Sequence, residues 1–97
     1  MIRSFADETT ADLFTERASR AARRIPLAIW PVERRKLKWL DVAVRLSDLA
    51  SPPGNRLERL RGRLKGRHSI RVNEQYRLTF RWEDGHAYEV RCEDYQA

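Results

Sequence analysis

The residues most able to do chemistry are arginines that alternate with apolar side chains between residues 69 and 95. Successive side chains of a strand point to opposite faces, so this alternation predicts strands with one buried face. The predicted buried face carries Ile70, Val72, Tyr76, Leu78, Phe80 and Trp82. Arg71 and Arg77 fall on the other face. A guanidinium group binds phosphate through two parallel N–H donors. The pattern therefore indicates a small sheet that presents phosphate-binding groups on its open side.

The charge of the chain also favours a polyanionic partner. The 97 residues are enough for one domain, spanning 1–97, with a modest core. The net charge is +6 and the pI is about 10.2. Arginine supplies 17 of the 20 basic residues, although a genome rich in G and C also enriches arginine. The basic residues gather in 54–81, whereas 82–97 is acidic.

Several classes of protein are disfavoured by residues that the chain lacks. Cys92 is the only cysteine, so no internal disulfide forms, and we expect it to be a small buried residue beside Tyr88 and Val90. No spacing of histidine, cysteine and carboxylate residues indicates a metal site or a cofactor. There is no signal-peptide core and no apolar run that spans a membrane. We expect a cytoplasmic protein without a membrane partner.

The N-terminal half is predicted to be mainly helical. Residues 2–5 fit a short edge strand, and Asp7 fits the N-cap of a first helix. Pro31 suits the first turn of a second helix that runs to about Val44. Its apolar stripe would be Leu37, Leu40 and Val44, and its other side would be basic through Arg34, Arg35, Lys36 and Lys38. That basic side would either be solvated or contact ribosomal RNA.

The second half contains the turn signals of an antiparallel sheet. Leu46 and Leu49 fit a short turn that packs back on the core, and residues 51–55 read as a loop. Asp84 and Gly85 form the strongest hairpin signal, between two alternating runs.

These residues together resemble the HigB/GraT branch of the RelE-type bacterial toxins. The similar segments are Pro52-Pro53-Gly54-Asn55-Arg56-Leu57-Glu58, Ser69-Ile70-Arg71-Val72-Asn73, Gln75-Tyr76-Arg77, Phe80-Arg81-Trp82 and Glu93-Asp94-Tyr95. The resemblance covers essentially the whole chain. It implies an α+β fold, with two N-terminal helices packed on a small, mostly antiparallel twisted sheet.

The resemblance also implies an activity and partners. The expected activity is ribosome-dependent cleavage of mRNA in the A site, by metal-independent attack of a 2′-hydroxyl on the adjacent phosphate. The expected partner is a cognate antitoxin, usually a small helix-turn-helix DNA-binding protein. Operator DNA would be contacted only through that antitoxin.

The resemblance further assigns candidate site residues. Arg77 matches the arginine of the family's sheet motif, with Arg71 assisting from the neighbouring strand. Asp94 is the candidate general acid or base, and Tyr95 would stack on a base or orient a phosphate. We expect Arg71, Arg77 and Asp94 to lie together. Further RNA contacts would come from Arg61, Lys65, Arg67, His68 and Asn73. Alternatively, Arg77 would simply pair with Glu89 or Asp94.

One position departs from the family's pattern. Many relatives end in Asp-Tyr-His, but here the position of the histidine is Gln96, which exchanges no proton near neutral pH. A second histidine position of this branch is Glu58 here. Asp94 and Glu58 would then carry the proton transfers, or the chain would be a weakened or inactive member that binds the antitoxin and co-regulates transcription. A free nucleic-acid binder is a third reading.

Overall fold

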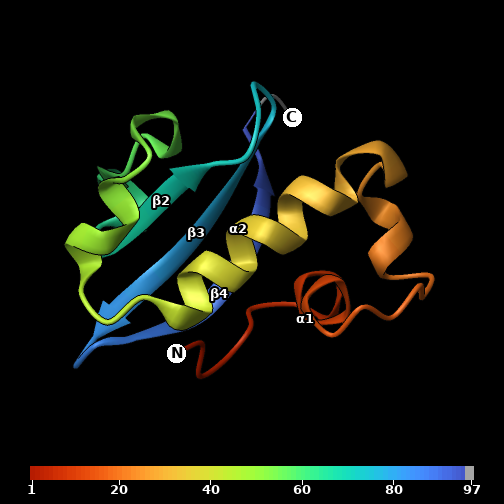
Figure 1. The fold of residues 1–97 in the computed structure, drawn as a ribbon, viewed down its shortest axis with the longest axis horizontal. Helices are drawn as coiled ribbons and strands as arrows, with labels where there is room; N and C mark the ends of the chain where they lie inside the picture. The colour runs from red at the N-terminus through yellow and green to blue at the C-terminus, as the bar shows by residue number, and fades with distance from the viewer. Residues whose placement is uncertain (96–97) are drawn as a thin grey trace.

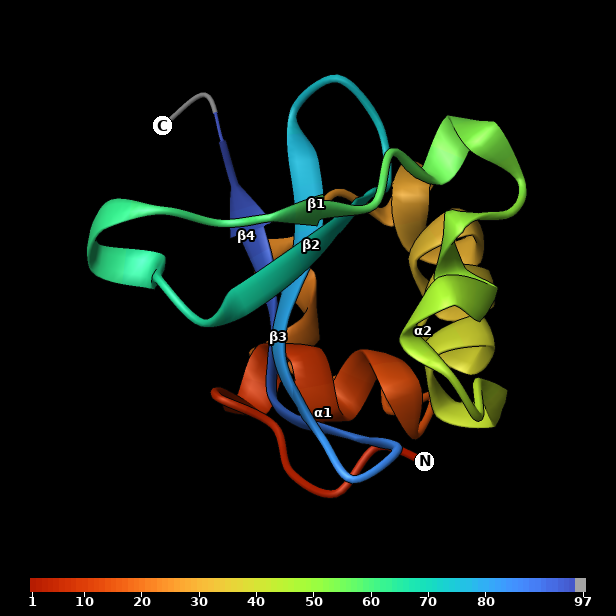
Figure 2. The same ribbon diagram turned by 90° about the vertical axis from the view of Figure 1, so that its left-hand side faces the viewer.

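The computed structural model describes residues 1–95 as two helices on one face of a four-stranded sheet (Figures 1 and 2). The helices are α1 (Glu8–Phe14) and α2 (Trp30–Val42). The strands are β1 (Glu58–Arg59), β2 (Arg67–Arg71), β3 (Tyr76–Glu83) and β4 (His86–Asp94). They are antiparallel and lie in the order β1-β2-β3-β4. The expected α+β architecture is confirmed, whereas the two-residue strand β1 was not predicted.

The core lies between the helices and the apolar face of the sheet. Tyr76, Leu78 and Phe80 of β3 are buried and Trp82 is partly buried, as their alternation predicts. Leu37 and Leu40 of α2 pack in the same cluster. Burying such side chains stabilises a fold by roughly 1.5–3 kcal/mol each.

The helices begin where the sequence indicates, but α2 ends early. The Asp7 side chain accepts the backbone N–H of Thr10 at 2.9 Å and caps α1, as predicted. Pro31 lies in the first turn of α2. The helix was predicted to run to about Val44 and ends at Val42, because the backbone becomes extended at Ala43. Val44 is 74% exposed and does not join the apolar stripe.

A β-bulge in β4 changes the side on which one aromatic residue lies. Thr79 pairs with Arg91 and Arg81 pairs with Tyr88, so one extra residue is inserted in β4. Glu89 has a φ of 53° there. Tyr88 therefore lies on the arginine face of the sheet, with its ring 4.7 Å from Arg81 Cζ. Its predicted position beside Val90 and Cys92 is wrong, because strict alternation ignores the inserted residue.

Turns connect these strands largely as the sequence predicts. Asp84 and Gly85 have φ values of 50° and 80° and join β3 to β4 as a two-residue hairpin turn. The segment 2–5 follows β4 in parallel, through isolated bridges of Ile2 to Ala87 and of Phe5 to Val90. Short 3-10 turns occupy Ala22–Arg24, Leu27–Ile29, Leu46–Ala50, Pro53–Asn55 and Gly62–Leu64.

Two charged residues of α2 are buried rather than exposed. Lys36 is 6% exposed and its Nζ donates to Asn55 Oδ1, so its predicted place on the basic face is wrong. Desolvation, with the nearby charges of Arg35 and Arg71, lowers the pKa of Lys36. Glu33 is fully buried and accepts the S–H of Cys92 at 2.6 Å. No helix within residues 1–95 is long and apolar enough to cross a membrane.

Candidate RNA-binding and catalytic site

The antiparallel register of β2 and β3 brings two candidate arginines together. Arg71 pairs directly with Arg77, so both side chains leave the sheet on the face opposite the helices. They line a cavity of about 280 Å³, together with Arg56, Asn73, Glu74 and Tyr95. We call it the Arg77 cavity. It gathers three guanidinium groups and one aromatic ring, which are groups that bind a phosphate and a base.

Arg77 is held by contacts that fix the direction of its guanidinium. Its Nε donates to Ser69 Oγ at 2.9 Å, and its Nη2 donates to the carbonyl oxygen of Arg56 at 2.7 Å. The Tyr95 ring lies 5.6 Å from Cζ. Only 11% of the side chain is exposed. The acidic partner of Arg77 is Glu58, at 3.9 Å, rather than Glu89 or Asp94 as sequence reasoning had allowed.

Two further arginines on this face, Arg81 and Arg67, are neutralised by acidic neighbours. Arg81 pairs with Glu83 at 2.5 Å and with Glu89 at 3.2 Å. Arg67 pairs with Glu89 at 3.5 Å and donates to its carbonyl oxygen at 2.6 Å. Arg71, in contrast, makes no hydrogen bond or ion pair with any residue from 1 to 95. Positive charge therefore remains available at the Arg77 cavity. Around Arg67 and Arg81, most of the charge is balanced by Glu83 and Glu89.

The carboxylate of Asp94 lies on the opposite side of the sheet from Arg77. Asp94 pairs with Tyr76, whose side chain is in the core, whereas Arg77 pairs with Glu93. Asp94 lines a different cavity, with Tyr76 and Cys92. The expectation that Asp94 joins Arg71 and Arg77 is wrong, because one residue along a strand reverses the face.

Asp94 nevertheless helps to place the end of the chain. Its Oδ2 accepts the side-chain amide of Gln75 at 2.9 Å, and the backbone N–H of Tyr95 donates to the carbonyl oxygen of Gln75 at 2.7 Å. These bonds tie the end of β4 to the turn between β2 and β3, so that Tyr95 reaches the Arg77 cavity. Gln96, the candidate at the histidine position, lies outside the described residues.

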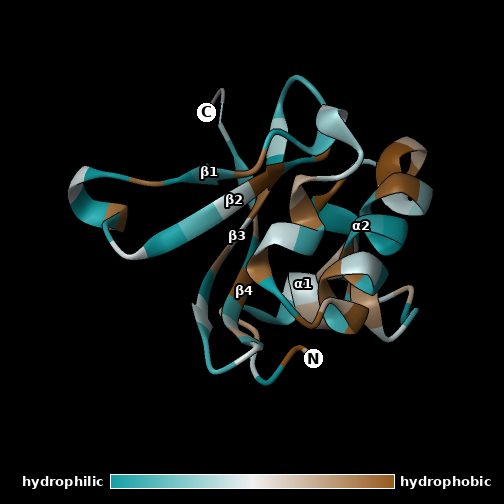
Figure 3. Ribbon diagram, turned by 60° about the vertical axis from the view of Figure 1, so that its left-hand side comes forward, coloured by the Kyte–Doolittle hydropathy of each residue, from teal (hydrophilic) through white to brown (hydrophobic). Residues whose placement is uncertain are grey.

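The remaining candidates divide between an exposed arm and the sheet. Arg61 and Lys65 are exposed on the connection between β1 and β2, an arm that Figure 2 shows projecting beyond the sheet and Figure 3 colours as mainly hydrophilic. Asn73 closes the turn after β2, where its Oδ1 accepts the backbone N–H groups of Gln75 and Tyr76 at 2.8 and 2.7 Å. It also lines the Arg77 cavity.

His68 points to the other side of the sheet. It pairs with Phe80 of β3, and the two rings lie 5.9 Å apart. Burial, with the charge of Arg59, lowers the pKa of His68. This placement separates His68 from the Arg77 cavity.

Sequence reasoning missed two residues that shape the site. Ser69 is fully buried and orients Arg77, and Arg56 supplies both a carbonyl acceptor and a third guanidinium. Arg56 adopts a left-handed backbone conformation, with a φ of 45°. Both residues occur in segments that carry the family resemblance, and that was the signal available for them, although the sequence did not indicate that the Ser69 hydroxyl would be buried against Arg77.

The comparisons with known proteins agree with this fold. Residues 3–95 match the family described as RelE-like toxin of type II toxin–antitoxin system HigB. This match, together with the fold, defines the class of the protein as a RelE-like toxin domain. The chain belongs to the HigB-like toxin family. Within residues 1–95 there is no group of three or more histidine, cysteine or carboxylate side chains that would hold a metal ion.

Two curated proteins are similar to part of the chain. Toxin HigB-1 of Vibrio cholerae is 59% identical over 63 residues, which are 65% of this chain and 66% of that protein. An uncharacterised protein of Haemophilus influenzae is 41% identical over 61 residues, or 63% and 60% of the two chains. The chain thus spans slightly less than two thirds of the length of each relative.

Solved structures extend the likeness of fold to nearly the whole chain. One is a YoeB–YefM complex from Staphylococcus aureus, with a TM-score of 0.59 at 16% identity, covering 96% of this chain and 95% of the other. Another is a YafQ mutant from E. coli, with a TM-score of 0.59 at 17% identity, covering 99% and 96%. At these identities the likeness concerns the fold alone.

Proposed function

We propose that this protein is a ribosome-dependent endoribonuclease that cleaves mRNA, and that a cognate antitoxin inhibits it. Membership of the HigB-like family supports the toxin class. The observation that carries the activity is the Arg77 cavity, where a fixed arginine lies beside Arg71, which has no acidic partner among residues 1–95. Such a cavity suits a phosphate that gains negative charge during a reaction.

The proposed reaction is a metal-independent transfer of the phosphate within the RNA chain. The 2′-oxygen of one nucleotide attacks the adjacent phosphorus, its proton passes to a base, and the 5′-oxygen leaves with a proton from an acid. The products are a 2′,3′-cyclic phosphate and a 5′-hydroxyl. Arg77 and Arg71 would offset the charge that develops on the phosphate oxygens. The exposed ring of Tyr95 would stack on a neighbouring base.

Glu58 is the carboxylate that pairs with Arg77, and this makes it a candidate for the proton transfer. It is exposed, and its Oε2 lies 3.9 Å from Arg77 Nη2, on the open face of the sheet. We propose that Glu58 is the base, and that Asp94 acts through Gln75 as a positioning residue for Tyr95. Arg61 and Lys65 of the exposed arm would contact the RNA backbone beyond the cleaved bond.

Arg77→Ala tests the proposal, with Arg81→Ala as a matched control on the same face of the same strand. Loss of one preorganised cation is expected to slow cleavage by roughly 100- to 1000-fold. Arg81 is already paired with Glu83 and Glu89, so its removal should leave cleavage nearly unchanged. Cleavage is measured with purified ribosomes and a defined mRNA by mapping new 5′ ends, after circular dichroism shows that both variants fold. Equal losses in both variants would contradict the proposal.

A second candidate function is antitoxin binding and co-regulation of transcription without cleavage. The observation that favours it is the absence of a histidine from the Arg77 cavity, among residues 1–95. The histidine position of the family carries Gln96. Gln96→His distinguishes the two functions. A gain of toxicity would mean that the wild type lacks an efficient proton carrier, whereas unchanged toxicity would favour the Glu58 route.

A further inference from the structure

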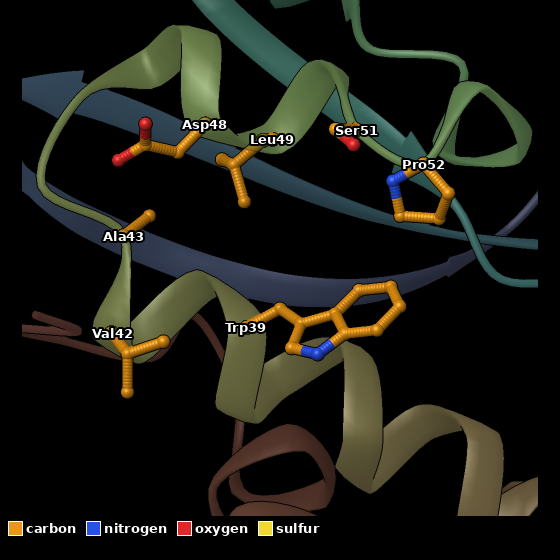
Figure 4. A pocket seen from close by; sticks show the side chains of 7 residues that line it. All are labelled: Trp39, Val42, Ala43, Asp48, Leu49, Ser51 and Pro52. Atoms are coloured by element: carbon orange, nitrogen blue, oxygen red, sulfur yellow. The ribbon is translucent and has the colours of Figure 1, made fainter.

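An apolar cavity lies at the C-terminal end of α2 and shares no lining residue with the Arg77 cavity. We call it the Trp39 cavity, and its volume is about 250 Å³. Its lining residues are Trp39, Val42, Ala43, Asp48, Leu49, Ser51 and Pro52. Figure 4 shows the Trp39 ring on α2 facing Leu49 and Pro52 from the segment that follows the helix. Val42, at the edge, is 59% exposed. Exposed apolar groups beside a concavity mark a site of interaction.

The Trp39 cavity is suited to an aliphatic side chain rather than to a metabolite. Sites for small molecules usually measure roughly 300–1,000 Å³ and contain several converging polar groups. Here the carboxylate of Asp48 is already engaged, because its Oδ2 accepts the backbone N–H groups of Val44 and Arg45 at 3.0 and 2.9 Å. Those bonds lower the pKa of Asp48. The Asp48 carboxylate is therefore occupied by backbone hydrogen bonds, and the rest of the cavity lining is mainly apolar.

Positive charge adjoins the cavity along the same side of α2. Lys38 and Arg35 are exposed, four and seven residues before Val42, which is the spacing of one helix face. The guanidinium of Arg35 lies 5.6 Å from the Trp39 ring. Both basic residues also line a second cavity of about 380 Å³, together with Phe14, Glu16 and Arg34. We call Arg35 and Lys38 the basic stripe.

This combination of an apolar cavity and a basic stripe selects an acidic protein segment as the occupant. A second copy of this chain, with its net charge of +6, would bring like charges together on the two stripes. RNA would use the basic stripe but would leave the aliphatic lining without a complementary group. A segment with an aliphatic residue and nearby carboxylates satisfies both parts of the surface.

We propose that the Trp39 cavity receives an aliphatic side chain from an acidic segment of the antitoxin, whose carboxylates lie against Arg35 and Lys38. The proposal rests on the proposed function, because it takes the antitoxin as the partner. It places this contact at a surface separate from the Arg77 cavity. The antitoxin is thus anchored at a place where the toxin does not need to touch RNA.

The test compares Val42→Asp with Leu27→Asp in binding to the purified full-length antitoxin encoded beside the gene. Both residues are exposed aliphatic side chains, at 59% and 67%, but Leu27 precedes α2 and lies outside the cavity. Loss of a buried aliphatic contact should weaken binding of the Val42 variant about 10- to 100-fold in calorimetry. The Leu27 variant should bind like the wild type. Val42→Gln repeats the test without a negative charge at the helix C-terminus.

Charge reversal tests the other half of the surface. Arg35→Glu combined with Lys38→Glu should weaken binding and should reduce its dependence on salt, because screened attraction to carboxylates is removed. Overlapping peptides from the antitoxin should bind the wild-type protein only when they contain an aliphatic residue next to acidic ones.

The outcomes separate this proposal from the proposed function. Val42→Asp should still cleave RNA at the wild-type rate in the absence of the antitoxin, since Val42 lies outside the Arg77 cavity. If the wild type shows no cleavage but Val42→Asp still loses the antitoxin, the docking site stands and the nuclease proposal fails. The docking proposal would be overturned if Val42→Asp and Leu27→Asp bound the antitoxin with equal affinity, whether unchanged or equally weakened. It would also be overturned if Val42→Asp dissociated a homodimer, or if RNA binding required Val42.

Discussion

Glu33 is expected to make the stability of this protein depend on pH in the neutral range. It is fully buried in α2, its Oε1 accepts the S–H of Cys92, and its Oε2 has no hydrogen-bond partner within residues 1–95. Burial raises the pKa of Glu33 from 4.5 to about 7. The folded state therefore holds a proton that the unfolded chain releases between these two pH values.

The direction and size of the effect follow from this shift. The folded state binds more protons than the unfolded state between pH 4.5 and about 7, so the free energy of unfolding falls as the pH rises through that range. Each unit of pKa corresponds to about 1.36 kcal/mol, so the total loss is about 3 kcal/mol. The contribution of Glu33 to the free energy of unfolding is greatest below pH 4.5, and it is fully lost above about pH 7.

Glu33→Gln removes the titration while keeping a similar shape. Urea unfolding from pH 4 to pH 8 should show a difference between the wild type and this variant that changes by about 3 kcal/mol across the range. Glu16→Gln, at an exposed position, should follow the wild-type profile. Parallel curves for the wild type and Glu33→Gln would refute the reasoning, because they would mean that the buried carboxyl does not retain its proton.

The other predictions concern the site and one helix cap. Ser69→Ala should lower the cleavage rate more than RNA binding, measured by single-turnover kinetics and by fluorescence anisotropy, because it frees the Nε of Arg77. Glu58→Gln should lower the cleavage rate by roughly 100- to 10,000-fold if Glu58 is the base, and an unaffected rate would exclude that role. Tyr95→Ala should weaken binding of a single-stranded RNA by roughly 1–3 kcal/mol, and Tyr95→Phe should not. Asp7→Ala should lower the free energy of unfolding by about 1 kcal/mol in urea titrations, because α1 loses its cap.

Much of the sheet was predictable because alternation is a local property. The face that carries Arg71 and Arg77 follows from residues 69–82 alone, and the hairpin at Asp84 and Gly85 follows from two turn residues. The face of Asp94 also follows from alternation, because Asp94 lies two residues after the buried Cys92, and the expectation that it joins Arg71 and Arg77 did not apply that rule. The position of Tyr88 was not predictable in this way, because the bulge near Glu89 interrupts the alternation and no short-range pattern specifies a bulge.

The burial of Lys36 was also beyond sequence reasoning. A lysine among basic residues on a helix is expected to be solvated, yet Lys36 donates a hydrogen bond in the interior to the amide oxygen of Asn55, 19 residues later. Only the path of the chain between the two residues brings them together. The same limitation applies to Glu33 and Cys92, which come from α2 and β4.

The link between Lys36 and Asn55 has a consequence for how genetic data on this protein are read. Asn55 also donates to the carbonyl oxygens of Leu49 and Ser51. The next residue, Arg56, has the carbonyl oxygen that accepts a hydrogen bond from Arg77. A chain of contacts thus connects a buried side chain of α2 to a guanidinium on the other face of the sheet. If Arg77 is catalytic as proposed, screens for harmless mutants should recover substitutions at Lys36, because the loss of its bond to Asn55 would misalign Arg77.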